Sequence, residues 1–152
     1  MTGIQGVTVE SIKEHTDQRG WLKELFRIDN SNIRPTMAYA SHTKQGIVRG
    51  PHEHVFQSDF FVFIGQGDFE LHLWDNRKDS ATYTLYVKLI VGESNPVSVL
   101  IPPGVVHGYK AITPRGSFSL NFPNQLYAGV GKKGPVDEIR HEDDPKSMFK
   151  IK

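Results

Sequence analysis

Three histidines in two short segments give the chain its clearest means of doing chemistry. Residues 46–54, GIVRGPHEH, end with His52 and His54, and residues 101–108, IPPGVVHG, carry His107. Both segments combine β-type residues with Gly and Pro, so each histidine lies close to a turn. Imidazole is the side chain best suited to moving protons near neutral pH. The three rings can meet in one pocket only if the sheet that carries them folds back on itself.

The rest of the chain has the strand pattern that such a fold needs. Residues 60–64 form a continuous apolar run, which is typical of a strand buried on both faces. Residues 68–74 alternate strictly, with Phe69, Leu71 and Leu73 on one face. Further β-rich segments are 7–12, 21–26, 82–89, 97–101 and 117–122. About eight or nine short strands predict an all-β barrel or sandwich, and only residues 137–152 have room for a helical turn or two.

Composition narrows the class of protein. The 152 residues are enough for a single domain, which we place at 1–152. The absence of cysteine excludes disulfides, thiolate metal sites and a cysteine nucleophile. A net charge of +1, from 18 basic and 17 acidic residues, gives no reason to expect nucleic acid as a partner. No apolar run is long enough to cross a membrane and the first residues do not resemble a signal peptide, so we expect a cytoplasmic protein without membrane contact.

The spacing of the histidines resembles that of a known class of small β-barrels. The patterns Gly-x5-His-x-His, ending at His54, and Pro-x-Gly-x2-His, ending at His107, match the two half-motifs of cupins. Each half-motif needs a turn residue and an imidazole at fixed offsets, so the pair is more specific than either alone. The resemblance implies a double-stranded β-helix, or jelly-roll barrel, with a short and mostly irregular C-terminal tail.

A metal site is the first chemistry to test against this pattern, because metal-binding cupins add a carboxylate to three such histidines. Counted back from Gly65 or Gly67, the carboxylate position falls on Ser58 or Phe60, and Asp59 lies one residue away in either register. One residue along a strand is the opposite face, so Asp59 points away from the histidines unless a bulge intervenes. We therefore expect no metal and no other cofactor. A bound metal and histidines that only hydrogen-bond inside the barrel stay open as alternatives to a proton-transfer pocket.

Four sequence blocks extend the resemblance over most of the chain. They are DxRGxxxExF at 17–26, SxTxxGxxRGxH at 41–52, DxRxxSxT at 75–82 and IPxGxxHG at 101–108. In these blocks the chain resembles the dTDP-4-dehydrorhamnose 3,5-epimerases, a family of nucleotide-sugar cupins. The resemblance implies an isomerase that acts on an NDP-4-keto-6-deoxy sugar.

The same resemblance implies a set of nucleotide-binding residues. Arg19, Glu24 and Arg49 correspond to family residues that hold the nucleotide diphosphate and neighbouring groups. Arginine suits this task, because its planar guanidinium can contact a phosphate with two hydrogen bonds. We therefore expect Arg19 and Arg49 to face the same pocket.

The reacting groups are implied in the same way. His52 corresponds to the general base, which would remove a proton from the carbon next to the 4-keto group. His107 corresponds to a residue that helps to hold the substrate oxyanion or the fold, and we include Tyr127 among the substrate-binding residues. Met37 and Tyr39 stand where the family usually has polar residues of the nucleotide pocket, so the base or the sugar is expected to differ.

The departures from the family limit the reaction. A lysine that follows the base in the epimerases aligns with Phe60, and the tyrosine that reprotonates the sugar aligns near Asn121. For the aspartate that orients the base, Asp143 and Asp144 are the only candidates near the C-terminus. A double epimerisation needs protons delivered to two carbons, and these changes remove the groups that deliver them.

His54 favours a different isomerisation, a shift of the keto group instead of an epimerisation. Arg-Gly-x-His-x-His resembles the sugar 3,4-ketoisomerases, which shift the keto group of a dTDP-4-keto-6-deoxyhexose from C4 to C3. Residues i and i+2 of a strand point to the same side, with Cβ atoms roughly 6 to 7 Å apart, so His52 and His54 could act as base and acid. A structural His54 is the alternative, and His72 is expected on an exposed polar face.

Three functions are therefore open. The first is a cofactor-free nucleotide-sugar isomerase, either a single-centre epimerase or a 3,4-ketoisomerase. The second is a metal-dependent cupin enzyme, and the third is a nucleotide-sugar-binding relative without turnover. Epimerase relatives form dimers by exchanging N-terminal strand edges, and an unpaired edge near residues 7–28 predicts a homodimer here.

Overall fold

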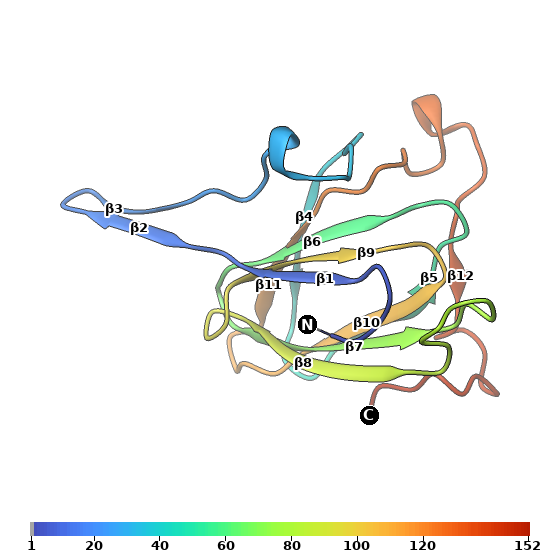
Figure 1. Ribbon diagram of the computed structural model, residues 1–152. Coiled ribbons are helices and arrows are strands. Elements are labelled where there is room, and N and C mark those ends of the chain that lie inside the picture. Colours follow the sequence, from blue (N-terminus) through green and yellow to red (C-terminus); the bar gives the residue numbers. More distant parts are fainter. Residues whose placement is uncertain (1) are drawn as a thin grey trace.

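The computed structural model describes residues 2–152, whose regular secondary structure consists almost entirely of antiparallel β-strands (Figure 1). The first five-stranded sheet has the order β1 (Thr8–Ser11), β9 (Val97–Ile101), β6 (Asp59–Phe63), β11 (Ser117–Asn121) and β4 (Tyr39–Thr43). The second has the order β12 (Ile139–Arg140), β5 (Val48–Glu53), β10 (Val105–Ala111), β7 (Asp68–Asp75) and β8 (Tyr86–Gly92). No helix among these residues is long and apolar enough to cross a membrane. The all-β architecture predicted from the sequence is confirmed.

The core lies between the two sheets. Phe69, Leu71 and Leu73 point into it as their alternation predicts, and none of the three is exposed to solvent. Phe69 meets Tyr109 edge to face, with ring centroids 4.8 Å apart and planes at 73°. Complete burial of a large apolar side chain contributes roughly 1.5 to 3 kcal/mol to stability. The apolar inner faces therefore hold the two sheets together and give the site a firm base.

The pairing of β5 with β10 brings the two histidine segments together. β10 lies between β5 and β7, and His107 is directly opposite His52 in the register. Gly50 permits this close approach, because a Cβ on it would lie 2.7 Å from the carbonyl oxygen of His107. Gly50 also has a φ of 81°, a value that residues with a side chain rarely adopt.

Two predicted segments differ from the structure. The strand expected at 82–89 begins only at Tyr86, because the hydroxyls of Ser80 and Thr82 bond to Asp75 and hold the preceding residues in turns. The tail, residues 137–152, contains no α-helix. It pairs briefly with β5 through β12 and continues in turns, and Pro145 would interrupt a helix at its centre.

His72 lies on the outer face of β7 as predicted, but it is not exposed. Only 6% of the residue is accessible to solvent. Its ring stacks on Trp74, and its Nδ1 lies 2.8 Å from the hydroxyl of Tyr86. Alternation identified the face correctly, but the aromatic neighbours that cover the ring come from two strands.

A hairpin near the N-terminus stands apart from the barrel. It consists of β2 (Glu14–Asp17) and β3 (Gly20–Lys23) and extends away from the two sheets in Figure 1. Trp21 and Leu22 on β3 are 59% and 63% exposed. β1 pairs only with β9, so its other edge is unpaired within the described chain. The predicted unpaired edge is present, and the homodimer stays a prediction.

Candidate active site

A cavity of about 900 Å³ lies beside the histidine segments. Its walls come from β4, β5 and β10 and from residues between 123 and 142. Polar and aromatic side chains line it, among them Tyr39, Arg49, His52, His54 and Tyr127. Small-molecule sites typically have volumes of about 300 to 1,000 Å³, so the cavity is large enough for a sugar nucleotide.

The three imidazoles predicted to converge do so. The ring centroids of His52 and His107 are 4.6 Å apart, and those of His52 and His54 are 5.5 Å apart. His54 follows β5 directly, and its ring lies 5.6 Å from that of His107. The i and i+2 positions of His52 and His54 therefore point to the same side, as predicted.

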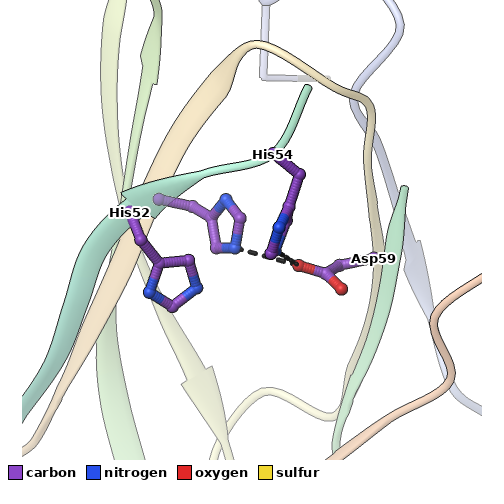
Figure 2. Close-up of side chains that lie close together, drawn as sticks. His52, His54 and Asp59 are labelled. Atoms are coloured by element: carbon purple, nitrogen blue, oxygen red, sulfur yellow. Dashed lines mark hydrogen bonds and ion pairs between the residues drawn. The ribbon is translucent and has the colours of Figure 1, made fainter. Parts of the chain in front are cut away.

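Asp59 joins this group, and the prediction that it points away is wrong. It is the first residue of β6, it is 1% exposed, and Figure 2 shows its carboxylate directed at His54. Its Oδ2 lies 3.1 Å from Nε2 of His54 and 3.0 Å from Nε2 of His107. Within β6 the inward positions are 59, 61 and 63, with Phe61 and Phe63 in the core. Counting back across the Gly65–Gly67 turn gave the wrong face, because the number of residues in that turn is not fixed.

The other carboxylate oxygen of Asp59 is held by two amides. Gln57 Nε2 donates to Oδ1 at 2.8 Å, and Asn121 Nδ2 donates to it at 2.9 Å. Asn121 also donates to the hydroxyl oxygen of Tyr39, at 2.8 Å. Asn121 stands near the position that aligns with the proton-donating tyrosine of the family. Its amide therefore connects the Asp59 carboxylate to a different tyrosine, Tyr39.

Charge is unevenly distributed among the histidines and Asp59. Burial, together with the imidazoles of His107 and His54, lowers the pKa of His52 to about 2, so this ring is neutral near pH 7. Burial opposes charge on His54 as well, but its contacts with Asp59 and Asp137 outweigh this and raise the pKa of His54. For Asp59, burial favours the neutral acid, but the contacts with His107 and His54 dominate and lower its pKa. The carboxylate is therefore ionised beside a neutral His52.

Asp137 fixes the tail against the site. Its carboxylate accepts hydrogen bonds from the backbone N–H groups of Val55, Phe56 and Gln57, at 2.7 to 2.9 Å. Its carbonyl oxygen accepts a hydrogen bond from Nδ1 of His54. One residue of the tail therefore orders the loop after β5 and sets the orientation of the His54 ring.

The carboxylates next to His52 are not the predicted ones. Oε1 of Glu138 lies 3.6 Å from Nδ1 of His52, and Oε1 of Glu142 lies 3.9 Å from it. Asp143 and Asp144, the candidates named from the sequence, are exposed. Glu138 lies beside His52 because it directly precedes β12, which pairs with β5.

Two of the predicted substrate-binding residues line the cavity. Arg49 is held by its Nε, which donates to the Thr43 hydroxyl at 2.9 Å, and by its Nη2, which donates to the His42 carbonyl at 3.3 Å. Tyr127 lies in the segment that follows β11 and is 54% exposed. Both are therefore available to a ligand.

Two more of the predicted substrate-binding residues, Arg19 and Glu24, do not reach the cavity of their own chain. Arg19 lies on the hairpin, pairs with Asp17, and has a side chain that is 85% exposed. Glu24 follows β3 and borders a separate hollow on the outer face of the first sheet, together with Phe60. Within one chain, the expectation that Arg19 and Arg49 face the same pocket is wrong, because the hairpin extends away from the barrel.

His107 supports the site rather than lining it. It is 1% exposed and is not among the residues that border the cavity. Its Nδ1 lies 3.0 Å from the carbonyl oxygen of Val105. Of the two roles that the resemblance implies, holding the structure fits this position and contacting the substrate does not.

Tyr39 is the group that the sequence interpretation missed as a source of protons. It borders the cavity, and burial raises the pKa of its phenol to about 12. The signal that could have identified it is its alternation with Ser41 on β4, which places both on the cavity side.

The barrel and its histidine-lined cavity place the chain among cupin-like enzymes, and comparison with known proteins identifies the family. Residues 1–136 match the model of the dTDP-4-dehydrorhamnose 3,5-epimerase family. The chain belongs to this family, and it is an isomerase-type enzyme.

Two relatives illustrate the range of the family. A probable low-salt glycan biosynthesis epimerase of Haloferax volcanii is 38% identical over 130 residues, which are 84% of this chain and 83% of that protein. The spore coat polysaccharide biosynthesis protein SpsL of Bacillus subtilis is 37% identical over 111 residues, 72% of each chain.

Solved structures agree with the fold. A dTDP sugar isomerase from Desulfovibrio desulfuricans G20 superposes with a TM-score of 0.82 over 97% of this chain and 91% of that one, at 19% identity. A dTDP-4-dehydrorhamnose 3,5-epimerase from Sulfolobus tokodaii gives 0.74 over 90% and 77%, at 25% identity. The predicted cupin jelly-roll is confirmed.

Proposed function

We propose that this enzyme isomerises or epimerises an NDP-4-keto-6-deoxy sugar, and that His52 removes the proton next to the ketone. The observation that carries the proposal is the position of His52: its ring borders the cavity, and its buried Nδ1 faces Glu138 and Glu142 at 3.6 and 3.9 Å. With its hydrogen on Nδ1, toward these carboxylates, the neutral imidazole has a lone pair on Nε2 that can accept a proton. The two carboxylates would stabilise the imidazolium that forms.

The reaction also needs a group that returns a proton. Nδ1 of His54 donates to the Asp137 carbonyl and Nε2 faces Asp59, so both nitrogens are engaged within the protein. This arrangement argues against His54 as the acid. The Tyr39 hydroxyl accepts its hydrogen bond from Asn121, which leaves its own proton free to donate. We assign the donor role to Tyr39, and a single donor fits a single proton transfer to one carbon.

Residues at the rim of the cavity would bind the nucleotide. Arg49 is braced by Thr43 and His42, so its remaining guanidinium N–H groups can contact a diphosphate. The relatives named for glycan and polysaccharide biosynthesis, and a Legionella pneumophila epimerase solved with dTDP-4-keto-L-rhamnose, support a nucleotide sugar as the ligand.

The exposed hairpin supports a homodimer in which each chain completes the site of the other. Arg19 lies on the hairpin, which extends away from the barrel, and Trp21 and Leu22 on the same hairpin are exposed apolar side chains. Packing the hairpin on a second chain would bury them and bring Arg19 to that chain's cavity. Mixing two inactive variants, Arg19→Ala and His52→Asn, tests this: hybrid dimers would contain one intact site and regain activity. A monomer at micromolar concentration in light scattering would contradict the dimer.

Exchange in D2O tests the reaction itself. The enzyme is incubated with a panel of nucleotide 4-keto-6-deoxy sugars, and NMR follows which ring carbons acquire deuterium. Exchange confined to the carbon beside the ketone, and lost in His52→Asn, supports the proposal. The product then distinguishes an epimer from a 3-keto sugar. A folded protein that binds these sugars but exchanges no carbon would instead be a binding relative without turnover.

A further inference from the structure

Residues 141–152 leave the cavity and cross the outer face of the second sheet (Figure 1). None of the described residues after Glu142 borders the cavity. Near the end of this segment, Phe149 contacts Trp74, which lies on the face of β7 that points away from the core. The segment is also outside residues 1–136, the part of the chain that the family model matches.

A buried carboxylate on β5 holds the start of this segment. Glu53 is 6% exposed and follows His52 directly, so its side chain points to the opposite face of the strand. Nε2 of His141 lies 2.9 Å from Oε1 of Glu53 and donates to it, because a carboxylate only accepts. Asn76 Nδ2 donates to the same oxygen at 2.8 Å. The backbone N–H of His141 donates to the Pro51 carbonyl at 2.9 Å, so this residue is fixed through both its backbone and its side chain.

Apolar contacts hold the end of the segment. Phe149 is 8% exposed, and its ring meets those of His141 and Trp74 edge to face, with centroids 4.7 and 5.7 Å away. Two residues further on, Ile151 lies against Gly108, where a Cβ would be 2.9 Å from the Ile151 Cδ1. The segment is therefore attached to three strands of the second sheet.

The residues just before this attachment face the cavity. Glu138 and Glu142 border it and His141 does not, so the chain presents carboxylates to one side and the imidazole to the other. Asp137 fixes the beginning of this stretch, and β12 adds only two paired residues. The position of Glu142, beyond β12, therefore depends on the attachment of His141 to the outer face.

We propose that residues 141–152 act as a clamp that holds Glu138 and Glu142 beside His52. The proposal rests on the proposed role of His52 as the base, and it adds the means by which the hydrogen of this ring is kept in place. Carboxylates that face Nδ1 favour the tautomer with its hydrogen on Nδ1, which leaves the lone pair on Nε2. When the clamp is loosened, the carboxylates withdraw and the preference for this tautomer decreases.

His141 and Phe149 are the positioning residues of the clamp, since they attach it to the sheet and do not border the cavity. In Phe149→Ala we expect turnover to fall roughly ten-fold, a part of the about two to four orders of magnitude that a general base contributes. Affinity for a nucleotide diphosphate should stay unchanged, because Arg49 is held by other residues. Met148→Ala, at a neighbouring side chain that is 80% exposed, is the matched control and should turn over like the wild type.

Nitrogen-15 NMR of the full-length protein with labelled histidine shows where His52 carries its hydrogen, and His52→Asn identifies its signals. We expect the hydrogen on Nδ1 in the wild type and in Met148→Ala, and a mixture of tautomers in Phe149→Ala. A variant that only lowered stability would leave this signal unchanged in the folded protein.

Two substitutions of His141 keep the proposal testable if Phe149→Ala does not fold. In His141→Gln the amide supplies an N–H donor to Glu53, so turnover and the His52 tautomer should stay close to those of the wild type. In His141→Ala the carboxylate of Glu53 keeps only the donor from Asn76, so both should change as in Phe149→Ala.

These measurements separate the clamp from the proposed reaction. If the wild type turns over no sugar, the reaction is refuted, and the His52 tautomer in the variants still decides the clamp. If the wild type is active and folded Phe149→Ala and His141→Ala keep its turnover, the clamp is refuted and the reaction stands. Lost turnover with an unchanged tautomer would also overturn the clamp, because the loss would then arise elsewhere in the fold.

Discussion

Asp59 and Asp75 are carboxylates in one barrel, each 1% exposed, but their neighbours differ in kind. Around Asp75 every neighbour donates: Arg77 contacts both oxygens at 2.8 and 2.9 Å, and the hydroxyls of Ser80 and Thr82 each bond to Oδ2 at 2.6 Å. Around Asp59, two amides donate to one oxygen, and two imidazole nitrogens that are acceptors in the neutral ring face the other.

The comparison distinguishes a carboxylate that supports the fold from one that serves a site. A fully satisfied buried charge holds a turn in place, here the one before β8. An arrangement that leaves acceptors facing one another costs stability, and folded proteins keep such arrangements mainly where function requires them. Substitutions around Asp75 should therefore change stability, and those around Asp59 should change ligand binding and turnover.

The largest effect should follow from His52→Asn. Removal of a general base typically slows a reaction by about two to four orders of magnitude. The ring carries no charge near pH 7 and makes no hydrogen bond through Nδ1, so the melting temperature should change little. Steady-state turnover and circular dichroism together measure both. The control is His72→Asn, on the outer face of β7, and retained turnover in His52→Asn would exclude this residue from the mechanism.

Asp75→Asn should mainly destabilise the fold. Breaking a buried pair by removing one partner typically costs about 3 to 5 kcal/mol, and the partial exposure of Arg77 places this case near the lower value. Urea unfolding monitored by fluorescence gives the free energy, with Asp79→Asn as the exposed control. Turnover per folded molecule should stay unchanged. A loss below about 1 kcal/mol would show that the donors around Asp75 do not stabilise the fold.

Arg49→Ala should weaken nucleotide-sugar binding by roughly ten- to a hundred-fold, since a charge-assisted contact contributes about 1.5 to 3 kcal/mol. Calorimetry with an unreacted nucleotide diphosphate measures the change. Arg115→Ala removes an exposed arginine that pairs with Glu93 outside the cavity and should have no effect. Equal affinity in the wild type and Arg49→Ala would remove this residue from the site.

The stability that Asp75 contributes should depend on pH. Burial alone would raise its pKa, but hydrogen bonds from Arg77, Ser80 and Thr82 outweigh this and hold the pKa well below its usual value. A carboxyl group with a depressed pKa stabilises the fold fully above its unfolded pKa, about 3.9, and loses that contribution as the pH falls below it. The difference in unfolding free energy between wild type and Asp75→Asn should therefore shrink between pH 4 and pH 2. A difference that stays constant would contradict the shift.

The fold and the meeting of the histidines could be read from the sequence, because both depend on local patterns. Alternation identified the inner face of β7, and the turn residues beside His52 and His107 marked the strands that pair. The face of Asp59 could not be predicted, since it depends on the number of residues in the turn at Gly65–Gly67, from which the position was counted. The same holds for Glu138, which reaches His52 only because the tail pairs with β5.

The position of Arg19 shows a second limit. Its sequence block matches the family well, but the hairpin that carries it makes no contact with the cavity of its own chain. A motif indicates which residue types are present and does not indicate which chain they serve. Tyr39 shows the converse: the tyrosine that we propose as the proton donor lies directly opposite Asn121 on the neighbouring strand β4, although the two residues are 82 positions apart in the sequence.

The smallest effect on stability should come from Asp59→Asn, and it tests the comparison most directly. The same chemical change at Asp75 replaces an acceptor with a donor among donors, but at Asp59 it places a donor opposite the Nε2 atoms of two imidazoles, which accept hydrogen bonds when the rings are neutral. The amide oxygen retains the contacts from Gln57 and Asn121. Replacing a buried polar group by one of the same shape that satisfies its neighbours is nearly neutral, so the unfolding free energy should change by less than about 1 kcal/mol. Urea unfolding of both variants in one buffer measures the contrast. If Asp59→Asn loses as much stability as Asp75→Asn, the imidazoles must already carry protons that bond to Asp59, and the two carboxylates play the same structural role.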